Sequence, residues 1–146
     1  MRLFTACALL AIALGLAACG QNGGSASNTV SPTESAANAK AAGLMPPFAP
    51  LFPSARVQSS IGTGTGPNAA GTVSFATDAQ PEAVIAFYRE RALADGMEET
   101  PDTADTGTLA FTARKDDMQM QVLASPGGSG SNVQVLWARH AEEDDD

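Results

Sequence analysis

Histidine and cysteine are scarce in this chain of 146 residues, which has one histidine, His140, and two cysteines, Cys7 and Cys19. A Ser-His-Asp system needs a histidine held in a folded core as its base, and His140 stands close to the C-terminal end. The serine-containing "GGSGS" run lacks the strand-to-helix setting that a nucleophilic serine requires. The glycine-rich stretch from Gly62 to Gly71 leads to another strand and not to a phosphate-binding helix. We therefore expect no enzyme.

Positive charge is also sparse, since eight Lys and Arg face sixteen Asp and Glu and the formal net charge is −8. Nowhere are more than two basic residues adjacent, so a nucleic acid is excluded as a partner. Five acidic residues, 142–146, close the chain. With His140 they offer ligands to a divalent cation, but a tail without a fixed geometry binds weakly. We interpret residues 141–146 as a solvated acidic tail.

A hydrophobic run long enough to cross a membrane is missing as well. The longest begins after Met1-Arg2 and covers the fourteen mostly apolar residues from Leu3 to Leu16. As a helix it would rise roughly 21 Å, against the ~30 Å of a bilayer's hydrocarbon core. A basic start, a short apolar stretch and small residues after it are typical of a secretory signal peptide, here residues 1–18.

The signal ends in Leu16-Ala17-Ala18-Cys19, which resembles the bacterial lipobox. The resemblance implies that Cys19 receives diacylglycerol, becomes the first residue after cleavage, and is then acylated, commonly with palmitate. Two or three acyl chains make a stable anchor, so the membrane is an expected partner. Gly20, where an inner-membrane retention signal would have Asp, favours the outer membrane. The alternative is an ordinary signal peptide with a cysteine at its edge by chance.

Two segments follow the lipobox. Residues 19–45 are rich in Gly, Ser, Asn and Ala and predict a flexible tether. Residues 46–140 form the predicted domain, which begins with an extended segment stiffened by Pro46, Pro47, Pro50 and Pro53. We expect the hydrophobic residues of this segment to lie along the edge of the domain; they are Leu44, Phe48, Leu51 and Phe52.

The domain has an alternating strand pattern interrupted by one helix. Strands are predicted over 56–60, 72–77, 109–113, 118–122 and 133–138, with turns at Lys115-Asp116-Asp117 and in "SPGGSGSN". The helix begins at Pro81, has Glu82 in its first turn and is closed by Gly96. Its apolar face combines Val84, Ile85, Phe87, Tyr88 and Ala92. The predicted fold is α+β, an antiparallel sheet of four to five strands with one helix packed across it in the order β-β-α-β-β-β.

The region around this helix resembles a group of small bacterial lipoproteins over about Leu51 to Arg139. The residues that carry the resemblance are Thr77, Asp78, Pro81, Glu82, Val84, Phe87, Tyr88 and Gly96. They are packing residues, so the resemblance implies a fold more than an activity.

Three pairs or groups of side chains are candidates for chemistry. Met118 and Met120 lie on one face of a strand and are candidate thioether ligands for Cu(I), although core packing is the simpler explanation for them. Tyr88, Arg91 and Trp137 are candidates for a recognition surface, with core and rim positions as the alternative. Asp116-Asp117 is interpreted as a turn and not as a carboxylate pair.

These observations predict a lipid-anchored lipoprotein of the cell envelope, on the outer membrane and facing the periplasm. Its domain would act in binding or scaffolding, with an envelope protein as partner and no cofactor. The alternative is a periplasmic copper-binding protein that uses Met118 and Met120, which would require both side chains to be exposed.

Overall fold

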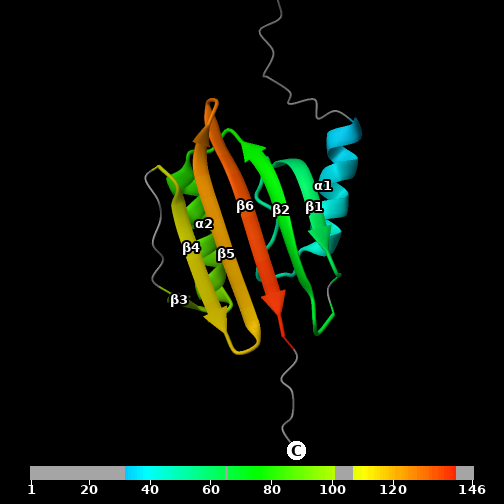
Figure 1. The fold of residues 1–146 in the computed structure, drawn as a ribbon. Helices are drawn as coiled ribbons and strands as arrows, with labels where there is room; N and C mark the ends of the chain where they lie inside the picture. Colours follow the sequence, from blue (N-terminus) through cyan, green and yellow to red (C-terminus); the bar gives the residue numbers. More distant parts are fainter. Residues whose placement is uncertain (1–31, 65, 101–106, 141–146) are drawn as a thin grey trace, which may run out of the picture.

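The computed structural model describes residues 32–64, 66–100 and 107–140. Along the chain the elements are α1 (Pro32–Leu44), β1 (Arg56–Gly62), β2 (Ala70–Thr77), α2 (Pro81–Ala94), β3 (Glu98–Thr100), β4 (Leu109–Lys115), β5 (Met118–Gly127) and β6 (Gly130–Arg139). Figure 1 shows one sheet with α2 behind it and α1 beside β1.

The strands form a single antiparallel sheet in the order β1-β2-β6-β5-β4-β3. The α+β class and the antiparallel sheet with a helix across it are confirmed. The predicted strand number and element order are not, because the described residues contain six strands and two helices. β5 and β6 form the longest pairing, from Met118 opposite Arg139 to Gly127 opposite Gly130. α2 packs mainly on the inner face of β4 and β5, and less on β3 and β6.

The start and end of α2 follow the signals in its sequence. Pro81 occupies the first turn together with Glu82, whose charge favours the positive end of the helix dipole. The Met97 N–H donates to the Ala92 carbonyl at 2.8 Å and the Gly96 N–H to the Leu93 carbonyl at 3.0 Å. Gly96 has φ +73° at this point. This pair of bonds is a Schellman cap, which explains why the helix ends at a glycine.

The core lies between α2 and one face of the sheet. The predicted apolar face of α2 is buried at Val84, Ile85, Tyr88 and Ala92, whereas Leu93, outside that face, is 62% exposed. Opposite it lie side chains at alternate strand positions, including Val73, Phe75, Phe111, Met120, Val122, Val133, Val135 and Trp137. The alternation of buried positions in the strands and the apolar arc of α2 therefore predicted which side chains of these elements form the core.

The predicted flexible tether over 19–45 is wrong for residues 32–44, which form α1 and pack against β1. Alanine is the best helix former, and Pro32 and Glu34 suit a first turn. Ala41 is fully buried. The Asn38 side chain donates from Nδ2 to the Ala55 carbonyl at 2.7 Å and accepts the Val57 N–H at Oδ1 at 3.0 Å. α1 has almost no hydrophobic face, so these specific contacts are what hold it against the sheet. Neither helix in the described ranges has the length and hydrophobicity to span a bilayer.

The segment between α1 and β1 does not run along the domain edge as predicted. Met45 and Phe48 belong to the core, with 6% and 4% exposure. The Phe52 ring stacks on Phe75 at 6.2 Å between centroids and meets Phe87 edge-on at 5.0 Å. The four prolines bend this segment into turns beneath the sheet, so it fills the part of the inner face that α2 leaves open.

A short strand forms in the acidic connection between α2 and β4, where no strand was predicted. Glu98–Thr100 forms β3, which pairs with β4 from Arg114 to Thr112. Arg89 on α2 holds it through two hydrogen bonds to the Glu99 carboxylate, at 3.1 and 3.0 Å. Residues 101–106 of that connection lie outside the described residues. Leu109 is 37% exposed at the start of β4, although alternation puts it on the same face as the buried Phe111.

Candidate binding face of the sheet

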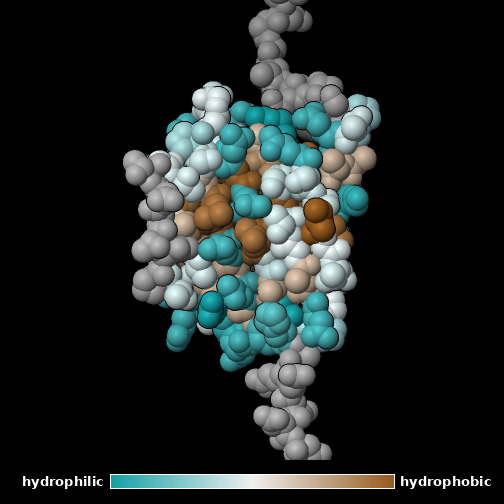
Figure 2. All heavy atoms as spheres, viewed as in Figure 1, coloured by the Kyte–Doolittle hydropathy of each residue, from teal (hydrophilic) through white to brown (hydrophobic). Residues whose placement is uncertain are grey.

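One face of the sheet has no helix over it. Its outward residues on the three central strands are Ala70, Thr72, Ser74 and Ala76 on β2, Asn132, Gln134, Leu136 and Ala138 on β6, and Gln119, Gln121, Leu123 and Ser125 on β5. We call this surface the open face. Figure 2 shows apolar side chains near its middle, over β5 and β6, a further one over β1, and hydrophilic side chains towards both ends.

None of these twelve outward residues is charged. Charged outward side chains occur at the margins, on β1 and β4. Arg56 is paired with Asp78 at 3.1 Å, and Arg114 lies opposite Glu98 across the β3–β4 pairing. In a chain with a net charge of −8, a solvent-facing sheet surface of this size would ordinarily carry Lys or Glu. Depletion of charge is typical of surfaces that become buried in a contact.

The open face is hollowed at one end. The hollow has a volume of about 520 Å³ and lies across β1, β2, β6 and β5. Its lining includes Ile61, Thr72, Leu136 and Gln121, which stand in one row because Ile61 pairs with Thr72, Thr72 with Leu136, and Leu136 with Gln121. Ala70, Ala138 and Gln119 form the next row. This volume is in the range of ordinary ligand sites.

The chemistry of the hollow is apolar with a few amides and hydroxyls. Leu136 and the two alanines supply contact area. Gln119 and Gln121 each offer an amide that donates and accepts, and Thr72 adds a hydroxyl. At its rim Ile61 projects into solvent and is 77% exposed. Such a surface suits another uncharged surface better than an ion, because no group in it can neutralise a charge.

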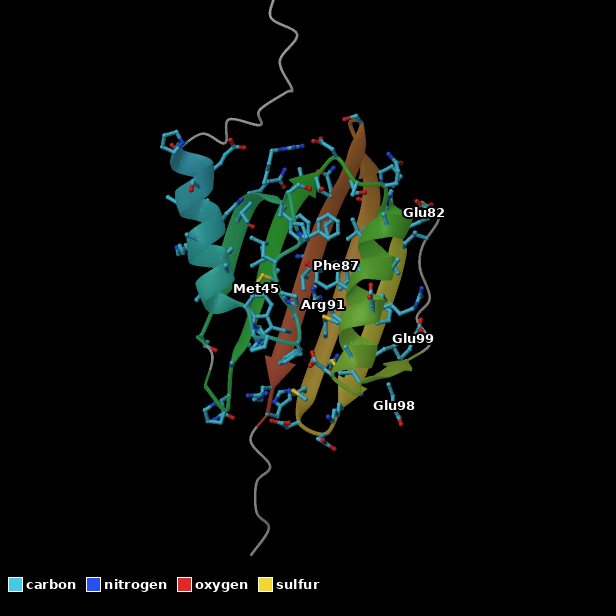
Figure 3. All side chains as sticks on the ribbon, turned by 180° about the vertical axis from the view of Figure 1, so that it is seen from behind. Met45, Glu82, Phe87, Arg91, Glu98 and Glu99 are labelled. Atoms are coloured by element: carbon cyan, nitrogen blue, oxygen red, sulfur yellow. The ribbon has the colours of Figure 1, made fainter. Side chains whose placement is uncertain are left out.

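Two of the three predicted recognition residues are not on a surface. Tyr88 is fully buried and Trp137 is 3% exposed. Trp137 lies on the same face of β6 as Val133 and Val135, so its side chain points towards the core. Only Arg91 is exposed, and its guanidinium lies over the Phe87 ring at 5.4 Å; Figure 3 shows both on the side of the sheet that α2 covers. The recognition surface predicted from these residues is therefore wrong, and their core and rim interpretation is correct.

The polar atoms of Tyr88 and Trp137 are unusual for their burial. Among the described residues, neither the Tyr88 hydroxyl nor Trp137 Nε1 has a partner in hydrogen-bond geometry. Burial raises the pKa of Tyr88 well above its usual value of 10.0, and the nearby Phe52 backbone offsets this only in part. Tyr88 therefore stays neutral in the folded protein. It packs edge-on against Phe87 at 5.1 Å, in the arrangement of a core side chain.

The methionine pair does not have the exposure that the copper alternative requires. Met120 is fully buried. Met118 is half-buried, and its sulfur accepts a hydrogen bond from Arg139 Nη2 at 3.2 Å, so a cation already faces it. Among the described residues no three His, Cys, Asp or Glu side chains are grouped as metal ligands would be. Asp116 and Asp117 form the β4–β5 turn, as predicted. His140 is exposed beside it.

Cys19 and the acidic tail over 141–146 lie outside the described residues, so lipidation stays a prediction. The open face itself was missed by sequence reasoning. A signal was present: the outward positions in "QMQVLAS" and "NVQVLWA" are Gln, Leu, Ser, Asn and Ala, without the charges expected of a solvated sheet face.

Comparison with known proteins gives one match. Residues 57–142, which include all six strands and α2, match a family model described as START domain-like. Neither the curated proteins nor the solved structures that were compared contain a match.

Proposed function

This chain belongs to the START domain-like family, and from that premise we propose that it is a lipid-anchored binding or scaffolding protein of the cell envelope. Domains of this family are generally binding domains. Cys19 provides the anchor, and Gly20 favours the outer membrane with the domain facing the periplasm. The domain binds through its open face.

The observation that carries the proposal is the uncharged open face with its hollow. A strongly acidic protein that keeps twelve adjacent sheet positions free of charge, and leaves Ile61 77% exposed beside them, has a lower solubility that a binding role explains. Serine, histidine and carboxylate groups do not converge in the hollow, which supports binding over catalysis as its role.

Docking of α1 on β1 supports a position of the domain close to the membrane. Only residues 19–31 lie between the proposed anchor and α1, and thirteen residues span at most about 45 Å. Confinement to that height raises the effective concentration of partners on the same membrane.

The anchor is tested by a matched pair of cysteine variants in the full chain. With Cys19→Ala, lipid labelling and retention in the membrane fraction should be lost, whereas Cys7→Ala, which changes the signal peptide only, should leave both unchanged. The mature wild-type protein should begin at Cys19 and carry the mass of its acyl chains. A mature chain that begins elsewhere without added lipid mass would contradict the anchor.

The binding face is tested by photo-crosslinking in living cells. Ile61→p-benzoylphenylalanine places a crosslinker on the open face, and Leu93→p-benzoylphenylalanine places one on the far side of α2 at similar exposure. We expect a defined adduct from position 61 and none from position 93. Absence of an adduct at position 61 would refute the open face as the binding surface.

A further inference from the structure

We infer that the open face binds a second copy of this chain, sheet against sheet, with Ile61 of each copy packed against the hollow of the other. The inference rests on the proposed function, because it names the partner of the same face. Four features support it: the charge, the shape and the area of the open face, and the direction in which α1 leaves the sheet.

Charge favours an identical partner. Two copies, each at −8, repel one another wherever their carboxylates meet. The outward positions of β2, β6 and β5 are the surface where this repulsion is least, because no charged side chain stands there. A different protein partner is ordinarily selected by complementary charge, and the open face offers none. An amide-rich face can satisfy its own copy, since each Gln both donates and accepts.

The shape of the face is self-complementary. A two-fold interface requires one surface to carry both a projection and the recess that receives it. Ile61 is the projection, and the hollow lined by Leu136, Thr72 and Gln121 adjoins it in the same cross-strand row. Rotation by 180° about an axis between β2 and β6 brings each Ile61 over the β5 and β6 side of the other hollow.

The area is sufficient for a specific contact. Four strands at about 4.8 Å spacing and eight residues at about 3.3 Å give a face of roughly 500 Å² per copy. Two copies together bury about 1,000 Å², which is the minimum for a specific interface and less than the ~1,200 Å² at which stable ones begin. Attachment to one membrane favours association further, because it confines both copies to a thin layer and so raises their effective concentration.

The direction of the chain is compatible with two anchored copies. α1 begins at the end of the sheet where β2 ends and β6 begins (Figure 1). A two-fold axis parallel to the strands leaves this end pointing the same way in both copies. Both chains can therefore be held from the same membrane without reorientation of either domain.

The first test is sedimentation equilibrium of the full-length protein in detergent, with the mass of bound detergent matched by density. Wild type and Leu93→Arg should sediment as dimers. Ile61→Arg should weaken dimerisation at least about tenfold, because it buries an unpaired charge on each side of the contact. Circular dichroism should show the same fold for both variants, since both positions are exposed. A monomeric wild type would overturn the inference.

The second test separates this inference from the proposed function. Two copies with different epitope tags are expressed together, and the adduct of Ile61→p-benzoylphenylalanine is isolated through one tag. Presence of the second tag at twice the monomer mass supports the second copy as partner. An adduct that contains another protein and never the second tag overturns the inference while the open face remains a binding surface.

Discussion

The indole of Trp137 occupies the space beside Gly71, its cross-strand neighbour on β2. A Cβ at position 71 would come within 2.7 Å of the Ile61 carbonyl oxygen, and closer still to the Trp137 ring. The largest side chain of the sheet is thus accommodated because β2 has no side chain opposite it. This relationship joins β6, β2 and β1 beneath the hollow.

Gly71→Ala should destabilise the protein by about 1–3 kcal/mol, because the new methyl group overlaps an indole and a backbone carbonyl that are both fixed by the sheet. Chemical denaturation followed by Trp137 fluorescence measures the loss, since Trp137 is the only tryptophan. Gly43→Ala is the control. Nothing lies within 4 Å of its Cβ, and in α1 the change should be neutral or stabilising by up to about 1 kcal/mol. Equal effects of the two substitutions would refute this packing.

Alkaline pH should destabilise the fold through Tyr88. Burial raises its pKa in the folded state, so the unfolded chain alone releases the phenolic proton as the pH passes 10.0. The stability contributed by the neutral phenol is complete below that pH and falls above it by up to about 1.4 kcal/mol per pH unit. Tyr88 is the only tyrosine, so absorbance at 295 nm should rise only when the protein unfolds.

Tyr88→Phe is the matched variant for that titration. It removes a hydroxyl for which the described residues offer no partner in good hydrogen-bond geometry, so the free energy of unfolding at pH 7 should stay the same or increase. The alkaline loss assigned to the phenol should disappear. A phenol that titrates near its usual pKa in the folded protein would show that Tyr88 is accessible to solvent.

Asn38→Ala should loosen α1 from the sheet. It removes both hydrogen bonds that tie α1 to Ala55 and Val57. The half-buried backbone N–H of Val57 then has no acceptor, which costs about 1–3 kcal/mol. Hydrogen exchange at the Val57 amide should accelerate more than exchange in β5 or β6. Lys40→Ala, an exposed change on the same helix, should leave the Val57 rate unaltered. Unchanged exchange in Asn38→Ala would mean that α1 docks through other contacts.

The pair of Arg56 and Asp78 should be visible in an acid titration. Hydrogen bonds from Arg56, and then its charge, lower the pKa of the Asp78 carboxyl below 3.8. Carboxyl-carbon NMR of Arg56→Gln should show that pKa rising towards 3.8, while Arg89→Gln, which breaks the pair with Glu99, should not move it. Because the pKa of Asp78 is lowered in the folded state, the ion pair stabilises the fold most above pH 3.8. This stabilisation is lost on acidification. An unmoved Asp78 pKa in Arg56→Gln would exclude this pairing in solution.

Sequence patterns predicted the parts of the fold in which local and tertiary signals agree. Val73 and Phe75 alternate, and Pro81 and Gly96 bound an amphipathic helix, so these elements were found. α1 was missed because its docking uses one alanine, Ala41, and one amide, Asn38, which leave no hydrophobic periodicity to read. β3 was missed because three residues are too few for alternation, and its position depends on Arg89 from another element.

The candidate site was harder to predict than the fold. Tyr88 and Trp137 were predicted as recognition residues because they are aromatic with polar tips, but both face the core. The open face instead carries Gln, Ser, Thr and Leu. No motif marks such a face. It becomes recognisable only when strand register sets Ile61, Thr72, Leu136 and Gln121 side by side. Register is a property of long-range pairing, which the sequence of any one strand does not contain.

Both margins of the sheet are poor templates for further strands. On one side the Val57 amide is taken by Asn38 of α1, and on the other the sheet ends in β3, which has three residues. Long, unprotected strand margins are where chains polymerise without limit. Margins of this kind disfavour growth by strand addition, so assembly through the sheet surface stops at a pair and does not proceed to filaments.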